Sequence, residues 1–421
     1  MSSEQWMISV DDHLIEPPSL WAERLPAKHR ELGPRWISDE HGESWLFEGK
    51  KRIPVDAMST NGGVYPPENR AEMFRPLAWS EVPQACYDPK ARIEAMDVDH
   101  ELAAVCFANM GGFAGSLFQR AEDKDLALLC IQAYNDWFME EWVDAYPGRF
   151  VGLSLIPMWD GELAAKEAAR MIAKGARSVS FSQAPHRLGF PPIADESWQK
   201  LFGVMNEANL PLCTHLGTGM APAEEEAAAD WGVKMREALK NNDLDSLAEK
   251  MQKESGRRTM RGLRPGTSTS LIGARMGQET LTDWLESGVF LRYPNLKVVL
   301  SENGVGWIPS VLSLTDWTEQ VHRTTDETPA THPMPSEQFR EHVFGCFIDE
   351  PINAKLLGEV GVDNIMIESD FPHTATNWPK SMERIDACLI DVSDDDRRKI
   401  LRGNAERIFQ FTPAQPQVPV G

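Results

Sequence analysis

The chain has few of the features that mark secreted or membrane-spanning proteins. Its six cysteines are scattered without a C-x-x-C pair, which argues against a disulfide framework and indicates reduced thiols. No stretch approaches the ~18 uncharged apolar residues that a transmembrane helix needs. The opening residues, MSSEQWMISVDDH, contain neither a basic segment nor a long apolar one, so no secretory signal is predicted. We therefore expect a cytoplasmic protein.

Basic residues are scarce relative to acidic ones. Lys and Arg number 42 against 64 Asp and Glu, which gives a formal net charge of −22. Nucleic acids and anionic membranes are bound through patches rich in Lys and Arg, so this balance argues against both as partners. The charge says little about the substrate, because most surface charge serves solubility. We expect a small-molecule substrate.

The sequence shows no repeat of fixed period, and no Gly-rich turn follows the first predicted strand, as the alternative doubly wound sheet would require. Short apolar runs instead alternate with longer segments of helical spacing, such as Asp123–Tyr146, Gly161–Gly175 and Glu196–Ala208. Several runs are apolar throughout, as expected for parallel strands covered on both faces. The predicted strands are Met7–His13, Leu102–Ala108, Phe150–Pro157, Ser178–Ser182, Leu210–Leu216, Lys297–Glu302, His342–Ile348 and Asn364–Asp370.

Eight strands that alternate with helices predict an α/β fold, the (β/α)8 TIM barrel. Such barrels exceed the usual domain length as one unit, so residues 1–412 are predicted to form a single barrel. Two segments are longer than a barrel needs. A small N-terminal insertion at about 31–85 is expected to form β structure, and a long helical insertion at about 217–296 separates strands five and six. Residues 413–421 form a Pro-rich tail.

Four of the predicted strands end in groups able to bind a metal. In a barrel, reactive side chains lie at the carboxyl ends of the strands, where the loops converge. Asp11 and His13 are two residues apart on the first strand, so both side chains leave the same face and can reach one ion. The other metal-binding groups are His215 on the fifth strand, Glu302 on the sixth and Asp370 on the eighth. The remaining strands end near Asn109, Met158, Gln183 and Asp349.

Imidazole and carboxylate groups suit a divalent metal ion, with Zn²⁺ expected first and Mn²⁺ or Fe²⁺ as alternatives. We expect Asp11, His13, His215 and Asp370 to be ligands in a site for one or two ions. Three roles are open for Glu302: a general base toward water, a further ligand, or a structural group that holds the loop after it. Asp370 is the second candidate for proton transfer.

Four more residues are candidates for the surroundings of the site. Glu16 and His373 each follow a candidate ligand by three residues, and we expect them to orient a ligand or contact the substrate. His186, in the loop after the fourth strand, is a candidate substrate contact. Trp307, just past the sixth strand, lies where an apolar pocket wall is needed.

Several blocks of the sequence resemble one known family. The string ISVDDHLIEPPSLW resembles the opening of the amidohydrolase-related family, in the branch that also holds aminocarboxymuconate-semialdehyde decarboxylase and the resorcylate-type decarboxylases. YDPKARIEAMDVDHELAAVCFAN, YPGRFVGLSLIP, LPLCTHLG, YPNLKVVLSENGVGWIP and NIMIESDFPH resemble its later blocks, in order, over about residues 7–410. The resemblance implies the barrel fold and dependence on a metal.

The resemblance also carries over residue by residue. The family's first-strand H-x-H corresponds to Asp11-x-His13, and acidic residues at the first position are known among its decarboxylases. His215 corresponds to the fifth-strand ligand and Asp370 to the eighth-strand aspartate. On the sixth strand many relatives carry a His that activates water, whereas this chain has Glu302, which puts that scheme in doubt.

Our first functional hypothesis is a metal-dependent hydrolase that cleaves a C–N, C–O or C–C bond. The alternatives are a non-oxidative decarboxylase of an aromatic or unsaturated acid, an iron-containing oxygenase, and a non-catalytic metal-binding partner subunit. A carboxylate substrate needs a cationic group, for which Arg52, Arg70 and Arg75 are candidates. Because barrels of this kind commonly pair, we expect a homodimer.

Overall fold

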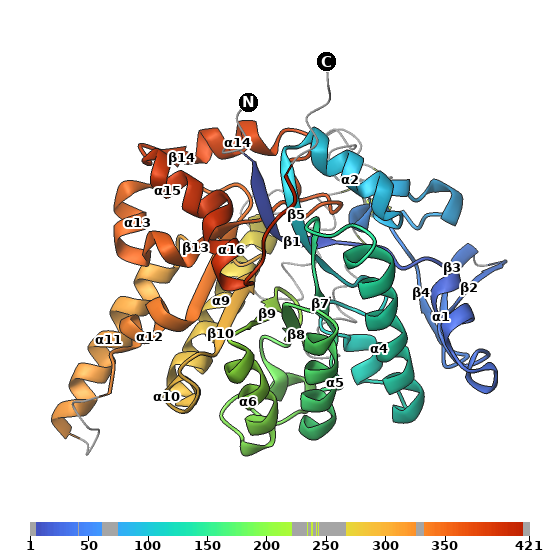
Figure 1. The fold of residues 1–421 in the computed structure, drawn as a ribbon, viewed down its shortest axis with the longest axis horizontal. Coiled ribbons are helices and arrows are strands. Elements are labelled where there is room, and N and C mark those ends of the chain that lie inside the picture. The colour runs from blue at the N-terminus through green and yellow to red at the C-terminus, as the bar shows by residue number, and fades with distance from the viewer. Residues whose placement is uncertain are drawn as a thin grey trace.

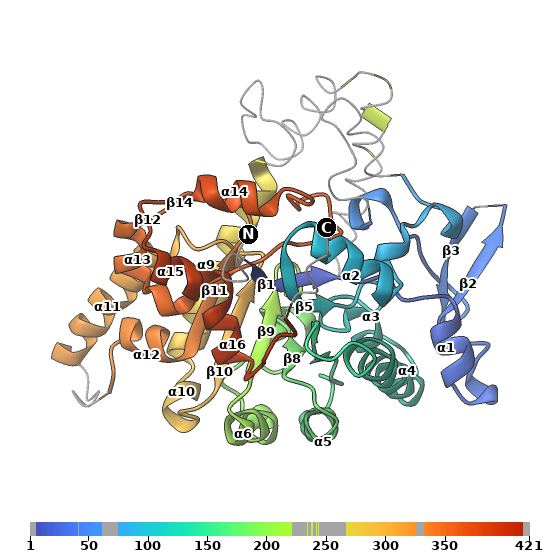
Figure 2. The same cartoon turned by 45° about the horizontal axis from the view of Figure 1, so that its top comes forward.

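Parallel strands surrounded by helices form the body of the molecule (Figure 1). The computed structural model describes residues 6–40, 42–60, 75–220, 267–325 and 332–415, together with the single positions 234, 237, 238, 241 and 243. Helices α4, α5 and α6 line one side of the strands and α11 to α13 another, as the tilted view also shows (Figure 2). This layering is the one predicted from the alternating sequence pattern.

The strands of the barrel coincide with the eight predicted ones, with ends that differ by a few residues. They are β1 (Met7–His13), β5 (Glu101–Phe107), β6 (Phe150–Val151), β7 (Leu153–Ser154), β8 (Ser178–Phe181), β9 (Pro211–His215), β10 (Lys297–Ser301), β11 (Val343–Phe347) and β13 (Ile365–Ile367). Parallel ladders join them in the orders β1-β5-β6 and β7-β8-β9-β10-β11-β13. This order of parallel strands is the one that the predicted (β/α)8 TIM barrel requires.

Two local features mark the places where these two ladders meet. The third predicted strand is divided at Gly152 into β6 and β7, because the backbone passes close to its neighbours there: a Cβ on Gly152 would lie 2.9 Å from Ala176 Cα. On the other side, the Asp370 amide donates to the Asp11 carbonyl and the His13 amide donates to the Phe371 carbonyl, each at 2.8 Å. These two bonds bring the ends of the first and last strands together.

Helices follow the strands as the sequence pattern predicts. They are α2 (Pro89–Val98), α3 (Ser116–Gln119), α4 (Lys124–Phe138), α5 (Gly161–Ala173), α6 (Gln199–Ala208), α11 (Ile308–Thr325), α12 (Pro335–His342), α13 (Ala354–Val360), α14 (Ser381–Cys388), α15 (Asp394–Arg398) and α16 (Asn404–Ile408). Asp88, Asp123 and Asp160 cap α2, α4 and α5 by accepting first-turn backbone N–H groups. Among the described residues, no helix combines the length and apolar character that crossing a membrane requires.

The barrel interior is filled with side chains and is not a pore. One cluster of buried residues draws on β1, β5, β6, β7, β9, β10, β11 and β13, and includes Val10, Val105, Val299, Phe344 and Met366. Two larger clusters pack the outer faces of the strands against the helices. Inward and outward faces are therefore both apolar, which explains why the strands read as continuous apolar runs.

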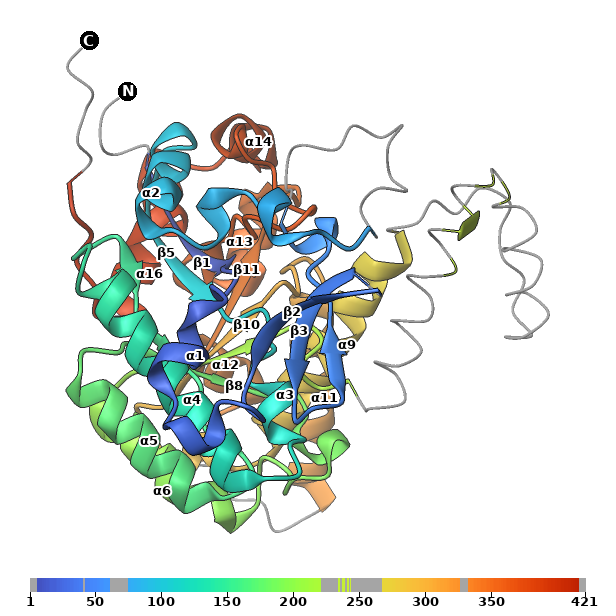
Figure 3. The ribbon, with the colours of Figure 1, turned by 90° about the vertical axis from the view of Figure 1, so that its right-hand side faces the viewer.

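The two predicted insertions are partly described. In the first, β2 (Arg35–Asp39), β3 (Gly42–Phe47) and β4 (Lys51–Ile53) form an antiparallel sheet, as expected, beside α1 (Ser19–Arg24) (Figure 3). The second contains α9 (Thr267–Glu286) and α10 (Val289–Arg292), which fits the predicted helical character. Residues 61–74, 221–233 and 244–266 of these insertions lie outside the described residues.

Candidate metal centre

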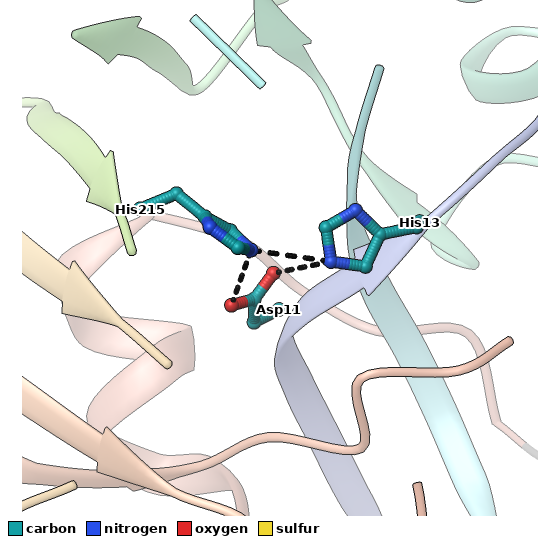
Figure 4. A group of neighbouring side chains, drawn as sticks. All are labelled: Asp11, His13 and His215. Atoms are coloured by element: carbon teal, nitrogen blue, oxygen red, sulfur yellow. Dashed lines mark hydrogen bonds and ion pairs between the residues drawn. The ribbon is translucent and has the colours of Figure 1, made fainter. Parts of the chain in front are cut away.

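Three of the predicted ligands form a compact buried group at the carboxyl ends of β1 and β9 (Figure 4). His215 Nε2 lies 3.2 Å from Asp11 Oδ2 and 3.2 Å from His13 Nε2, and His13 Nε2 lies 3.5 Å from Asp11 Oδ1. All three side chains are fully buried. Asp11 and His13 point to the same side because they are two residues apart on a strand, and β9 presents His215 from across the barrel.

Asp370 and His373 extend this group on the side of β13. Asp370 Oδ1 lies 3.0 Å from His13 Nε2 and 2.9 Å from His373 Nδ1. The His373 ring stacks on the His13 ring, with centroids 3.7 Å apart and an angle of 18° between the planes. His13, Asp370 and His373 thus form a second set of atoms close enough to share one ion.

The donor atoms fit a divalent metal ion. Both carboxylate oxygens of Asp11 are buried and have no hydrogen-bond partner among the described residues. His215 Nδ1 lies 2.7 Å from the Leu216 carbonyl, so this nitrogen carries the hydrogen and Nε2 offers its lone pair to the centre. Unpartnered carboxylate oxygens and imidazole lone pairs that converge are costly to bury without a cation. The arrangement therefore supports a divalent metal site.

The electrostatics of the group lead to the same conclusion. Burial and the negative Asp370 raise the pKa of Asp11 well above its usual value, and burial together with the neighbouring His373 lowers the pKa of His13. Burial also raises the pKa of Asp370, but His373 and His13 outweigh it and hold that pKa below its usual range. Burial thus favours the neutral form of the His13 ring, which lies beside carboxylates that repel one another, and a bound cation would relieve this repulsion.

Glu302 lies at the edge of this group rather than inside it. Its Oε2 is 3.9 Å from His215 Nε2, and the side chain is 24% exposed, whereas Asp11, His13 and His215 are fully buried. Desolvation and the neighbouring Asp370 raise the pKa of Glu302. The backbone amide of Glu302 donates to Glu368 Oε2 at 3.0 Å.

The loop after β10 is held by Glu350, not by Glu302. The backbone amides of Val305 and Gly306 donate to the two carboxylate oxygens of Glu350, at 2.8 and 2.7 Å. The structural role that we considered for Glu302 is therefore filled by a residue of the loop after β11. The Glu302 carboxylate faces the ligand group instead.

Glu302 and Asp370 share an unusual backbone conformation. Their backbone φ angles are +57° and +56°, in the left-handed region that residues other than glycine rarely adopt. Glu302 directly follows β10, and Asp370 lies three residues past the end of β13. Each turn is fixed by a hydrogen bond from the residue's own backbone amide: Glu302 N donates to the Glu368 carboxylate, and Asp370 N donates to the Asp11 carbonyl. A backbone of this kind persists where neighbouring groups hold it, and the two hydrogen bonds do so here.

Glu16 supports a loop rather than a ligand. It is fully buried and accepts hydrogen bonds from the backbone amides of Met110 and Gly111, at 2.8 and 3.4 Å. Burial raises the pKa of Glu16 to about 7. The same loop carries Phe113, whose ring centroid lies 4.0 Å from that of His215 and 4.7 Å from that of His13. Phe113 is an apolar wall of the centre that the sequence did not single out.

His186 and Trp307, two other predicted surroundings of the site, lie against α9. His186 is exposed and its Nδ1 is 4.0 Å from Asp283 Oδ2. Trp307 donates from Nε1 to the Asn303 carbonyl at 2.8 Å, and a Cβ on Gly277 would lie 2.7 Å from its ring. Trp307 therefore joins the loop after β10 to the insertion helix.

The candidate cationic groups for a substrate carboxylate are engaged elsewhere or not described. Arg52 pairs with Asp39, and Arg75 lies 2.8 Å from Glu81. Arg70 lies outside the described residues. Both of these partners, Asp39 and Glu81, lie within the first insertion.

Comparison with known proteins places this geometry in a family. A family model described as Amidohydrolase matches residues 39–411. Gamma-resorcylate decarboxylase from Polaromonas sp. (strain JS666 / ATCC BAA-500) is 26% identical over 295 residues, which cover 66% of this chain and 75% of the relative.

Solved structures share the fold over almost the whole chain. An amidohydrolase from Mycobacterium avium subsp. paratuberculosis K-10 superposes with a TM-score of 0.69 at 21% identity, covering 96% of this chain and 99% of the other. The 5-carboxyvanillate decarboxylase of Novosphingobium aromaticivorans DSM 12444, solved with bound manganese and 3-methoxy-4-hydroxy-5-nitrobenzoic acid, gives 0.60 at 17% identity, covering 97% and 98%.

Proposed function

This chain belongs to the amidohydrolase family, and on that basis we propose that it is a metal-dependent, non-oxidative decarboxylase of a hydroxylated aromatic acid. The observation that carries the proposal is the match to gamma-resorcylate decarboxylase over two thirds of the chain. A second decarboxylase shares the fold, and its bound ligand is an aromatic acid with a hydroxyl group. Decarboxylation is therefore better supported than the hydrolysis expected first from the sequence.

We propose Asp11, His13 and His215 as the core metal ligands, with Asp370 adjacent. The manganese in the 5-carboxyvanillate decarboxylase structure favours Mn²⁺ for this chain over the Zn²⁺ expected from ligand chemistry alone. A divalent ion held by these residues would supply positive charge that stabilises an anionic aromatic acid. It also offsets the negative charge of Asp11 and Asp370, which would otherwise repel an anionic substrate.

Asp370 is the proposed proton-transfer group. The Asp370 carboxylate lies 3.0 Å from His13 Nε2 and 2.9 Å from His373 Nδ1, which hold it at the centre, where its ionised form would accept the proton of a ring hydroxyl on the substrate. It then delivers this proton to the ring carbon that carries the carboxylate. The C–C bond breaks, its electron pair restores the aromatic ring, and carbon dioxide leaves. The phenolate product regains a proton from solvent.

Other side chains orient the reactants. His373 stacks on His13 and lies 2.9 Å from Asp370, which fixes the direction of the carboxylate. Phe113 covers the imidazoles of His13 and His215 and offers an apolar face to an aromatic ring. Glu302, partly exposed at the edge, is placed to hydrogen-bond a second polar group of the substrate.

The proposal is tested by incubating the Mn²⁺-loaded protein with 2,6-dihydroxybenzoate and related hydroxybenzoates in D₂O. We expect release of carbon dioxide and a product with one deuterium at the former carboxylate position, followed by NMR. Asp370→Asn is expected to lower kcat by at least about 100-fold, as loss of a general acid–base group does.

Two outcomes would contradict the proposal. One is the absence of carbon dioxide release from every hydroxybenzoate while an ester, amide or lactone is hydrolysed, which would restore the hydrolase hypothesis. The other is full activity in Asp370→Asn with an unchanged metal content, because Asp370 would then be dispensable for proton transfer.

A further inference from the structure

A buried arginine lies directly behind the candidate ligands. Arg92 is the fourth residue of α2, which packs beside β5 (Figure 1), and its side chain is fully buried. Among the described residues it is the only lysine or arginine that is buried. Its polar contacts are with the Ala85 and His13 carbonyls and the Asp12 carboxylate, none of which takes part in the proposed reaction.

The guanidinium contacts both of the last two residues of β1, Asp12 and His13. Arg92 Nη2 donates to the His13 carbonyl, and Nη1 lies 3.2 Å from Asp12 Oδ2. Nε donates to the Ala85 carbonyl at 2.8 Å, just before α2. The backbone of His13 and the side chain of its neighbour Asp12 are thus held by one planar group.

The same guanidinium contacts the segment that follows β13. Its Cζ lies 4.7 Å from the centroid of the Phe371 ring, over which it stacks as a cation. Phe371 directly follows Asp370, and its carbonyl accepts the hydrogen bond from the His13 amide. Arg92 therefore touches the residues next to Asp370 and next to Asp11 at once.

A chain of hydrogen bonds completes the connection through Asp12. Ser9 Oγ donates to Asp12 Oδ1 at 2.7 Å and accepts from the Ser369 amide at 2.9 Å. Asp12 points away from Asp11 and His13, as its place on the strand predicts, and joins Arg92 to the backbone just before Asp370. Two independent routes, one through Phe371 and one through Asp12, thus link Arg92 to the end of β13.

We propose that Arg92 is a positioning residue that sets the separation between the ends of β1 and β13, and through it the metal affinity of the centre. Only a planar guanidinium satisfies three acceptors in fixed directions while it stacks on a ring; a lysine ammonium offers a point charge without this geometry. The inference rests on the proposed metal centre but is independent of which reaction the centre catalyses.

The test compares Mn²⁺ binding by the full-length chain and by Arg92→Lys, measured by calorimetry and by the electron paramagnetic resonance spectrum of the bound ion. Arg92→Lys keeps the charge opposite Asp12 and loses the fixed geometry. We expect its Kd for Mn²⁺ to rise at least about 10-fold, the range seen when groups that orient metal ligands are removed. We also expect a changed spectrum, because the ligand geometry shifts.

Met96→Ala is the matched control. Met96 is buried on the same helix and touches the apolar cluster rather than the strand ends, so its truncation destabilises the fold without moving the ligands. We expect Met96→Ala to lower the midpoint of thermal unfolding while the Kd for Mn²⁺ and the spectrum stay as in the parent chain.

Asp12→Asn keeps the proposal testable if Arg92→Lys does not fold. It weakens the same connection from the other partner, and we expect a smaller rise in the Kd, about 3-fold or more, in line with the loss of one charge-assisted contact. Parent-like Mn²⁺ binding by Arg92→Lys, or by Asp12→Asn where only that variant folds, would overturn the proposal. Equal weakening by Met96→Ala would also overturn it. A parent chain that binds no divalent metal would instead overturn the metal centre itself.

Discussion

His13 contacts all the other central side chains of the candidate metal site. Its Nε2 lies within 3.5 Å of Asp11, Asp370 and His215, and its ring stacks on His373. Its backbone is fixed at both polar groups, since the amide donates to Phe371 and the carbonyl accepts from Arg92. A residue with so many geometric constraints is pre-organised to bind one ion in one place.

At the same scale, His215 and Glu302 are expected to differ in their effect on metal binding. His215→Ala removes a buried donor of the core group and should reduce bound metal to below about a tenth of an equivalent, measured by inductively coupled plasma mass spectrometry. Glu302→Gln should retain the metal, because the Glu302 carboxylate lies 3.9 Å from His215 and is partly exposed. Its activity is expected to fall about 10-fold or more, because the carboxylate proposed to hydrogen-bond the substrate becomes a neutral amide.

The exposed His186 offers a control for this comparison, since His186→Ala removes an imidazole that pairs with α9 and should leave metal content unchanged. Loss of metal in Glu302→Gln would instead identify Glu302 as a ligand, the second of the roles that the sequence left open. It would also favour a site large enough for two ions.

Single residues were predicted from the sequence where chemistry and strand position coincide. Asp11, His13, His215 and Asp370 were found because ligating side chains end four strands and because their blocks resemble a family. Phe113, Arg92 and Glu350 carry no such signal: an aromatic, an arginine on a helix and a surface-type carboxylate gain their roles only from what folds against them. Arg92 contacts Asp12 and Phe113 contacts His215, and the two residues of each pair lie far apart in the sequence.

At the scale of secondary-structure elements, α9 packs against the loop that carries Glu302. Gly277 permits this approach, because a Cβ there would lie 2.8 Å from Asn303 Oδ1 and 2.7 Å from the Trp307 ring. One turn earlier, a Cβ on Gly273 would lie 3.3 Å from the Glu302 carbonyl. The predicted insertion between strands five and six thus contributes a wall beside the centre.

Gly277→Ala is expected to destabilise the protein by about 1–3 kcal/mol, the usual cost of overpacking a tight contact. It should also lower kcat, because α9 must move away from the loop that holds Glu302. Gly203→Ala in α6 is the matched control: a Cβ there has open space, so it should stabilise the helix by about 0.5–1 kcal/mol. Chemical denaturation measures both, and destabilisation by both variants would contradict the packing argument.

At the scale of the whole molecule, metal binding and folding are expected to be coupled. Asp11, Asp370 and Glu302 come from three different strand ends of the barrel, and their mutual repulsion acts against bringing these ends together. Removal of the metal with a chelator should therefore lower the free energy of unfolding. The difference is about 2.7 kcal/mol when free metal is restored to 100 times its Kd.

Denaturant unfolding of the chelated and reconstituted protein measures this coupling. A His215→Ala variant should show no stabilisation by added metal, which separates the proposed site from nonspecific binding. An equal response of both chains would place the stabilising ion elsewhere.

The homodimer and the single-barrel organisation of residues 1–412 stay predictions. Sedimentation velocity tests the homodimer, and limited proteolysis tests the single barrel.

The sequence by itself determined the barrel and the identity of the candidate ligands, because both depend on local patterns: apolar runs that alternate with helices, and ligating groups at the ends of those runs. It could not divide the third strand at Gly152, since that break depends on the approach of Ala176. It also left the role of Glu302 open. Only the tertiary structure decided that Glu350 holds the loop and that Glu302 faces the centre, because both depend on distances between segments that meet only when the barrel closes.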